Sequence, residues 1–226
     1  MDNRMSLAQK INILRASVMG ANDGIISVAG IVVGVASAST SNYAIFISGI
    51  AGMLAGTVSM AMGEYVSVST QKDSEKQAVA EERLRLKNNY DHEFEFVKQK
   101  YLAQGISEHL ATKATEEMMK KDPLVTTVRE RYGLNINEII SPYSAAIASM
   151  ISFPTGSLLP MIAITAFPER YKIISTFIAV LIALALTGWG AAVLSKANKT
   201  HGIIRNMITG TLTMAVTYLI GKIIGG

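Results

Sequence analysis

Five long apolar runs constrain this chain more than any other feature of its sequence. A helix needs about 20 apolar residues to cross the roughly 30 Å hydrocarbon core of a bilayer. Five stretches reach or approach that length: Ala16–Ala38, Tyr43–Val68, Tyr143–Phe167, Ile173–Leu194 and Ile203–Gly221. Backbone groups in lipid must be satisfied within the segment, which favours helices. The sequence therefore predicts an all-α membrane protein with five transmembrane helices.

Charged residues are few, and most of the acids lie in one segment. Charged residues make up 17% of the chain, against about 25% in a soluble domain. Thirteen of the 17 acids lie between Lys72 and Glu138. The net charge of +4 does not indicate nucleic-acid binding, because the cations alternate with acids or flank the apolar runs. The absence of cysteine excludes disulfides, thiolate metal sites and iron–sulfur clusters.

The runs and the charged segment divide the chain into four parts. We expect an N-terminal segment at 1–15, two transmembrane helices within 16–69, a helical insert at 70–141 and three transmembrane helices within 142–226. Cations gather before the first helix, in the insert and after the fourth helix, so the positive-inside rule places these parts in the cytosol. The odd number of helices then places the C-terminus outside.

Sequence signals predict further helices in the insert and an interruption in one of the apolar runs. No Gly or Pro interrupts the second helix beyond Ser67, so we expect it to continue to about Lys87. Shorter helices are expected at 91–104, 107–121 and 124–132. In the third apolar run, Pro154 and Pro160 predict a kinked or broken helix whose break faces protein or a watery cavity.

Small residues are regularly spaced in the first two helices. The pairs Gly20/Gly24, Gly30/Gly34 and Gly52/Gly56 all have the GxxxG spacing, which lets helix backbones approach closely in lipid. Each pair alone is typical of ordinary helix packing. Their crowding into two helices predicts a tight contact, either within the chain or across a dimer axis.

Two carboxylates inside apolar helices need a physical reason. Asp23 lies in the first run, and Glu64 ends a row of Gly52, Gly56 and Met60 at four-residue intervals in the second. Each carboxylate costs about 2.5–3.5 kcal/mol at a helix centre. One interpretation is that one or both acids pair with a cation or cap a broken helix, although neither run contains an internal Lys or Arg. We favour an ion path in which both acids, at similar depth in the cytosolic half, bind a cation that competes with protons.

Other candidate ligands are less specific. Met60 adds a soft thioether to the hard carboxylate of Glu64, a mixture that suits Fe(II) better than Mg(II), but methionine in an apolar helix is more often packing. The acids of the insert alternate with Lys and Arg, as on an ordinary solvated helix face. The histidines are isolated and no hydrolase or phosphate-loop motif occurs, so no enzyme is predicted.

The motifs of the first two helices, taken together, resemble those of a known family. Asn22–Ser27 followed by Val32–Ala36, and Ser59–Ser67 followed by Gln71–Asp73, are similar to the vacuolar iron transporter family, and to its prokaryotic and yeast-type branch in particular. The resemblance covers nearly the whole chain. It implies a homodimer of five-helix protomers in the lipid bilayer that moves Fe(II), often also Mn(II), out of the cytosol in exchange for protons. The membrane would be the plasma membrane in a prokaryote and the vacuolar membrane in a eukaryote.

The resemblance also implies site residues, with no permanently bound cofactor. Asp23 and Met60 match residues that line the family's ion path, and Glu64 joins them here as a third candidate. Plant-type members have a further pathway glutamate where this chain has Gly52.

The family's insert binds metal through several glutamates, and its pattern is only partly present here. Glu82 and Glu93 match two of those positions, while Glu95 and Glu130 lie next to others. The remaining positions are held by Arg85, Phe96, Thr127 and Arg131. A different class of function therefore stays open beside transport, that of a non-transporting membrane scaffold or metal sensor that signals through the insert.

Overall fold

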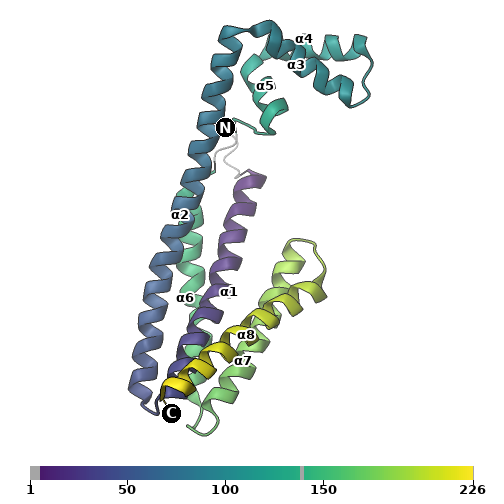
Figure 1. Ribbon diagram of the computed structural model, residues 1–226. Coiled ribbons are helices and arrows are strands. Elements are labelled where there is room, and N and C mark those ends of the chain that lie inside the picture. Colours follow the sequence, from purple (N-terminus) through teal and green to yellow (C-terminus); the bar gives the residue numbers. More distant parts are fainter. Residues whose placement is uncertain (1–5, 138–139, 226) are drawn as a thin grey trace. The chain divides into compact units, whose positions relative to one another are not determined.

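The computed structural model describes residues 6–137 and 140–225, and these residues form eight α-helices and no strand (Figure 1). The helices are α1 (Leu7–Ala38), α2 (Asn42–Asn88), α3 (Tyr90–Ala103), α4 (Glu108–Lys121), α5 (Pro123–Tyr132), α6 (Pro142–Ala166), α7 (Lys172–Leu194) and α8 (Lys199–Gly225). Parts of the predicted segments 1–15, 70–141 and 142–226 lie outside the described residues, namely 1–5, 138–139 and 226.

The chain divides into two compact units. The bundle unit comprises Lys10–Val66 and Ser141–Gly226, and the insert unit comprises Ser67–Ile140 with Met1–Gln9. Helix α2 contributes its first part to the bundle unit and its last part to the insert unit.

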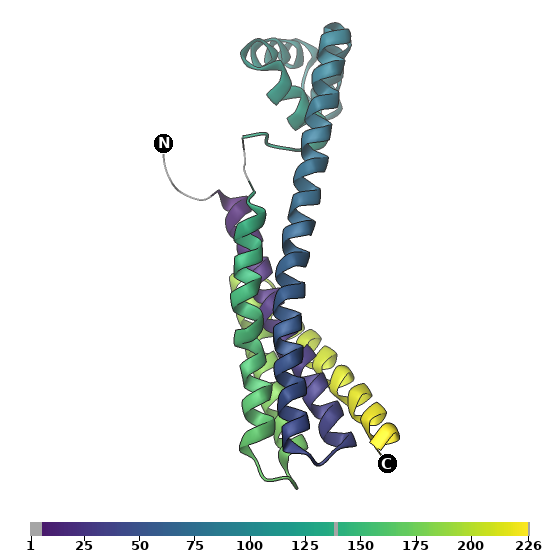
Figure 2. The same cartoon turned by 90° about the vertical axis from the view of Figure 1, so that its left-hand side faces the viewer.

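Helix α1 forms the centre of the bundle unit. One of its faces packs against α2 and α6 in a cluster that includes Val28, Val32 and Phe153. Another face packs against α7 and α8 around Ile25 and Leu184. Figure 2 shows α1, α2 and α6 side by side. Side chains of α1 are therefore held between two layers of helices, which fixes the rotation of this helix about its axis.

Five helices, α1, α2, α6, α7 and α8, are long and apolar enough to cross a membrane, as the sequence predicts. Helix α1 begins at Leu7 rather than at the predicted Ala16, and α8 runs from Lys199 rather than from Ile203. The difference arises because hydropathy locates the apolar part of a helix, whereas the hydrogen-bonded helix continues through flanking charged residues such as Lys10 and Arg15.

Regular stripes of exposed apolar side chains run along the outer helices of the bundle unit. On α7, the residues at four-residue intervals from Ile174 to Leu186 are all more than half exposed. A soluble protein rarely leaves such continuous apolar surface uncovered. These stripes are the surface that faces lipid tails in a membrane-spanning bundle.

The expected break in the third apolar run is absent. Helix α6 continues through Pro154 and Pro160, which both lie inside it. Each proline removes only one helical hydrogen bond, and contacts with neighbouring helices hold the rest of α6 together. Pro160 is buried and Pro154 half-buried within the bundle unit.

The glycine pairs make close helix contacts within the chain. A Cβ on Gly24 would fall on the carbonyl oxygen of Phe153 in α6, and a Cβ on Gly156 would fall on the carbonyl oxygen of Ala21 in α1. Further along α1, Gly30 and Gly34 face Thr217 of α8. Of the two alternatives open for the GxxxG pairs of α1, close contact within one chain is the one observed.

The insert unit is helical, as predicted, and has its own small core (Figure 1). Helix α2 continues to Asn88, and α3, α4 and α5 follow at nearly the predicted positions. Gly105 ends the α3 segment in the left-handed region, with φ of 86°. Asp122 caps α5 by accepting a hydrogen bond from the Val125 N–H.

Candidate functional site

Asp23 lies on the central helix α1, among small and apolar residues. Its carboxylate is half-buried, and Oδ1 accepts a 2.8 Å hydrogen bond from the Ser27 hydroxyl one turn away. No salt bridge to Asp23 occurs among the residues that the structure describes. An acid within a membrane-spanning helix and without a cationic partner is expensive, and such acids mark ion or proton paths.

A polar network on α1, beside Asp23, anchors the helix. The Asn22 side-chain oxygen accepts hydrogen bonds from Asn206 Nδ2 at 2.9 Å and from Thr187 Oγ1 at 3.3 Å. These bonds tie α1 to α7 and α8 within an apolar environment, where unsatisfied polar groups are costly. This network was not predicted from the sequence. A signal was present, because Asn206 and Thr187 are amide and hydroxyl residues within two of the predicted apolar runs.

Glu64 is buried, with 6% of its side chain exposed, and it is paired with a cation. Arg15 of α1 places Nη2 2.7 Å from Oε2 and Nη1 3.3 Å from Oε1, a two-pronged contact. Pairing with a cation, the alternative ranked below an ion path, is therefore observed for Glu64. The cation is not inside either apolar run: Arg15 immediately precedes the first run and reaches α2 from its own helix.

The pairing of Arg15 with Glu64 relates the two acids along α1. Arg15 precedes Asp23 by eight residues, or about two turns. The long side chains of Arg15 and Glu64 span part of that separation, so the similar depth expected for the two acids stays a prediction.

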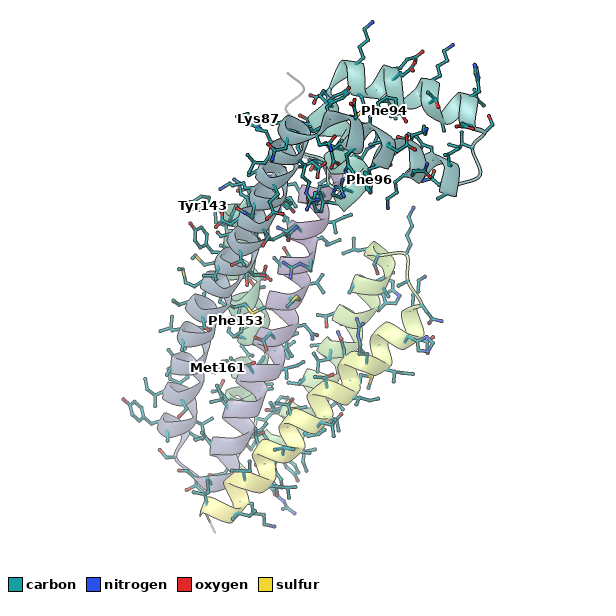
Figure 3. The ribbon with its side chains drawn as sticks, turned by 45° about the horizontal axis from the view of Figure 1, so that its top comes forward. Lys87, Phe94, Phe96, Tyr143, Phe153 and Met161 are labelled. Carbon is teal, nitrogen blue, oxygen red and sulfur yellow. The ribbon has the colours of Figure 1, made fainter. Side chains whose placement is uncertain are left out.

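Met60 lies one turn before Glu64 on α2 and is half-buried against the apolar cluster between α1, α2 and α6. Figure 3 labels two members of this cluster, Phe153 and Met161 of α6. Gly56 allows the Phe153 ring to approach, since a Cβ there would collide with it. The geometry is that of packing, and a ligand role for the Met60 sulfur stays a prediction.

In the insert, Glu82 and Glu93 come together around one arginine. Glu82 of α2 is 0% exposed and Glu93 of α3 is 2% exposed. Arg131 of α5 places Nε 2.9 Å from Glu82 Oε2 and a terminal nitrogen in contact with Glu93 Oε2. Its guanidinium lies over the ring of Phe96, 3.8 Å from the centroid. Figure 3 labels Phe96 among the side chains of the insert.

The pKa values of the two carboxyl groups that share Arg131 are shifted in opposite directions. Burial raises the pKa of Glu82, the adjacent Glu93 carboxylate raises it further, and Arg131 acts against both. For Glu93, burial acts upward, but hydrogen bonds from Glu82, Arg131 and His92 outweigh it and lower its pKa. Glu93 is therefore the carboxyl that carries the charge opposite Arg131.

The other two acids predicted as metal ligands in the insert lie apart from this group. Glu95 is half exposed and pairs with Lys98 at 2.9 Å. Glu130 accepts hydrogen bonds from Arg129 and from the Tyr101 hydroxyl, at 2.6 and 2.9 Å. Over residues 6–137 and 140–225, no three His, Asp or Glu side chains gather as a metal site.

Comparison with known proteins places this arrangement in a family. The sequence profile of the VIT family matches residues 14–222, which is most of the chain. The chain belongs to the VIT family. It is 36% identical over 209 residues to the "Vacuolar iron transporter" of Acanthamoeba castellanii, covering 92% of this chain and 77% of that protein. It is 33% identical over 214 residues to "Vacuolar iron transporter homolog 2" of Arabidopsis thaliana, covering 94% and 84%.

A relative from rice has the same identity to this chain as the Arabidopsis protein. "Vacuolar iron transporter homolog 1" of Oryza sativa subsp. japonica is 33% identical over 214 residues, covering 94% of this chain and 74% of that protein. Membership of the VIT family confirms the resemblance drawn from the motifs around Asp23 and Glu64. Together with the five apolar helices, it identifies the chain as a multi-pass membrane protein.

Proposed function

We propose that this chain transports divalent metal ions, Fe(II) and Mn(II), out of the cytosol in exchange for protons. The observation that carries the proposal is Asp23, a half-buried carboxylate within a membrane-spanning helix and without a cationic partner among the described residues. Its position supports a path through the bundle, because such an acid is retained where it binds an ion. The printed names of the relatives, vacuolar iron transporters, support metal as that ion.

The proposed path uses Glu64, Met60 and Asp23 in turn. A metal ion entering from the end of the bundle at which α1 begins would meet Glu64, the partner of Arg15, before Asp23, which follows Arg15 by about two turns on α1. Met60 lies one turn from Glu64 on α2, which supports a role for its sulfur in favouring Fe(II) over harder ions. Arg15 would have to release Glu64 before a metal could bind there, so we propose that Arg15 guards the path.

Proton exchange follows from the chemistry of the two acids. A carboxylate oxygen binds either a proton or a metal ion, so loading with metal releases protons and protonation releases metal. A proton gradient across the membrane then drives metal in the opposite direction. No cofactor is needed for this cycle, and no enzymatic reaction is proposed.

The proposed orientation places the N-terminus and the insert in the cytosol and the C-terminus outside. We also propose a homodimer. The basis for this proposal is the resemblance of the motifs in α1 and α2 to those of a family whose members are homodimers. The membrane would be the plasma membrane in a prokaryotic cell and the vacuolar membrane in a eukaryotic one.

A transport assay tests the proposal. The purified chain is reconstituted into liposomes with a pH gradient, and uptake of Mn(II) and of Fe(II) under reducing conditions is followed by a metal-quenched dye inside. We expect uptake that depends on the gradient and is abolished by Asp23→Ala. Uptake that does not depend on the gradient would contradict proton exchange. Normal uptake by Asp23→Ala would contradict the proposed path.

The alternative, a metal sensor that signals through the insert, has less support. It requires the insert to bind metal, but Glu82 and Glu93 are engaged by Arg131. A sensor would show metal binding without flux in the same liposomes, which separates the two functions.

A further inference from the structure

Glu82, Glu93 and Arg131 form a buried ion cluster that the proposed transport path does not use. Its members come from three helices, α2, α3 and α5, and both carboxylates are almost completely shielded from solvent. Charged groups are rarely buried to this degree unless they are paired or coordinate a metal. The cluster is therefore a position at which the insert requires a cation.

A divalent ion does not fit this position. Such an ion prefers about six oxygen or nitrogen ligands, and a usual protein site supplies at least three of them from side chains. Here two carboxylates are present, and no third His, Asp or Glu completes a metal site in the described residues. The guanidinium of Arg131 lies against both carboxylates, and Phe96 covers its face.

The fit of the arginine is specific. Its planar group contacts Glu82 through Nε and Glu93 through a terminal nitrogen, while the ring of Phe96 stacks at 3.8 Å. A guanidinium over an aromatic face is itself attracted to the ring, and its charge lies within ion-pair distance of both acids. One fixed cation thus serves both carboxylates without any exchangeable ion.

We propose that Arg131 is a built-in cation that takes the place of a metal ion in the insert, so that the insert keeps its structure without metal and binds none. Selection of the transported ion is then left to the helices of the bundle unit. The inference does not depend on the transport activity, because it concerns residues of the insert unit alone.

The inference has a consequence that can be measured. Without the guanidinium, the buried Glu93 carboxylate would lose the cation that neutralises it. The carboxyl groups of Glu82 and Glu93, with the amide oxygen introduced by Arg131→Gln as a third ligand, would then be able to accept a divalent ion. A variant without Arg131 should therefore become responsive to metal, whereas the natural chain should not.

The experiment uses the full chain in lipid nanodiscs, stripped of metal by a chelator, with and without Mn(II). Hydrogen exchange is followed by mass spectrometry in peptides from Tyr90–Ala103 and Pro123–Tyr132, which lie in the insert and report on it locally. In the natural chain, we expect Mn(II) to change exchange rates in these peptides by less than about twofold. A clear slowing of exchange by Mn(II) there would overturn the inference, whatever the transport assay shows.

Substitutions make the test sharper. In Arg131→Gln, we expect exchange in both peptides to rise by about tenfold or more, since a buried acid loses its partner, and Mn(II) to reverse most of that rise. The matched control is Arg129→Gln, on the same helix, whose partner Glu130 lies outside the cluster. It should show no response to Mn(II). Equal behaviour of the two variants would also overturn the inference.

A third variant covers the case in which Arg131→Gln does not fold. The triple change Glu82→Gln, Glu93→Gln and Arg131→Gln removes all three ionisable groups together, and replacing a whole buried ion group is often tolerated. We expect this variant to fold and to ignore Mn(II). A response to Mn(II) in its α3 and α5 peptides would place metal binding elsewhere in the insert and contradict the inference.

Discussion

Arg15 and Glu64 form an ion pair that joins α1 to α2, with Nη2 of the arginine 2.7 Å from Oε2 of the glutamate. The two partners differ in environment, because 44% of the Arg15 side chain is exposed while Glu64 is buried. The glutamate therefore depends on the arginine more than the reverse. Any metal ion that binds Glu64 must compete with this guanidinium.

Replacing Arg15 tests that competition. In Arg15→Gln, we expect the KM for Mn(II) uptake to fall about tenfold, which corresponds to roughly 1.4 kcal/mol of competition removed. The measurement is initial uptake into liposomes over a range of Mn(II) concentrations. Lys10→Gln, which removes an exposed cation from the same helix, controls for a general change in surface charge. An equal shift in both variants would mean that the pairing with Glu64 is not the cause.

Asp23→Asn tests the acid that carries the proposed function. Asparagine keeps an oxygen that can accept the Ser27 hydrogen bond, so the fold should be retained while the charge is lost. We expect uptake of Fe(II) and Mn(II) to fall by at least about tenfold, as for an acid that lines an ion path. The control is Asp91→Asn, an exposed acid of the insert, which should transport normally. Retained uptake by Asp23→Asn would exclude its charge from the mechanism.

Much of the fold follows from local sequence signals. Hydropathy located the five long helices because lipid requires about 20 apolar residues per span. The uninterrupted run of helix formers after Ser67 predicted the extension of α2, and Pro123 marked the start of α5. These features depend on residues close in sequence, so no knowledge of packing was needed.

The features that define the sites depend on contacts between distant segments, and these were not predicted. Arg15 and Glu64 are 49 residues apart in the chain, and nothing in either segment shows that the two side chains meet. The family resemblance indicated that Arg131 replaces a metal ligand. It did not indicate that one guanidinium would contact both Glu82 and Glu93. Such pairings are set by helix rotation, which packing decides.

The raised pKa of Glu82 predicts how the stability of the insert depends on pH. Because the folded insert holds the Glu82 proton more tightly than the unfolded chain does, this contribution is fully present below about pH 4.5. It is lost as the pH rises through the raised pKa. Glu93 acts in the opposite sense because its pKa is lowered. Its contribution to stability is present above the pKa of the unfolded chain and is lost as the pH falls through the lowered pKa of the folded insert.

Glu82→Gln separates the two contributions. The charged groups that act on Glu82 are Arg131, Glu93 and Arg85, and all of them remain in this variant. We expect the loss of stability on the alkaline side to disappear, and the loss in acid, which comes from Glu93, to remain. Protection factors in the α3 and α5 peptides between about pH 4 and 9 provide the measurement. A variant whose profile parallels that of the natural chain would assign the pH dependence to other groups.

The contact between α1 and α6 determines the position of Asp23, and two glycines offer a matched test of it. Gly24 lies against the backbone of Phe153, so a methyl group there must push the helices apart, with a loss of about 1–3 kcal/mol. Gly63 of α2 has nothing within 4 Å of the same added atom, and alanine there should stabilise the helix by about 0.5–1 kcal/mol. In detergent, the midpoint of thermal unfolding should therefore be lower for Gly24→Ala than for the natural chain, and equal or higher for Gly63→Ala. Because Asp23 directly precedes Gly24, uptake should fall in Gly24→Ala as well. Equal stability of the two variants would mean that the close contact does not hold α1 in place.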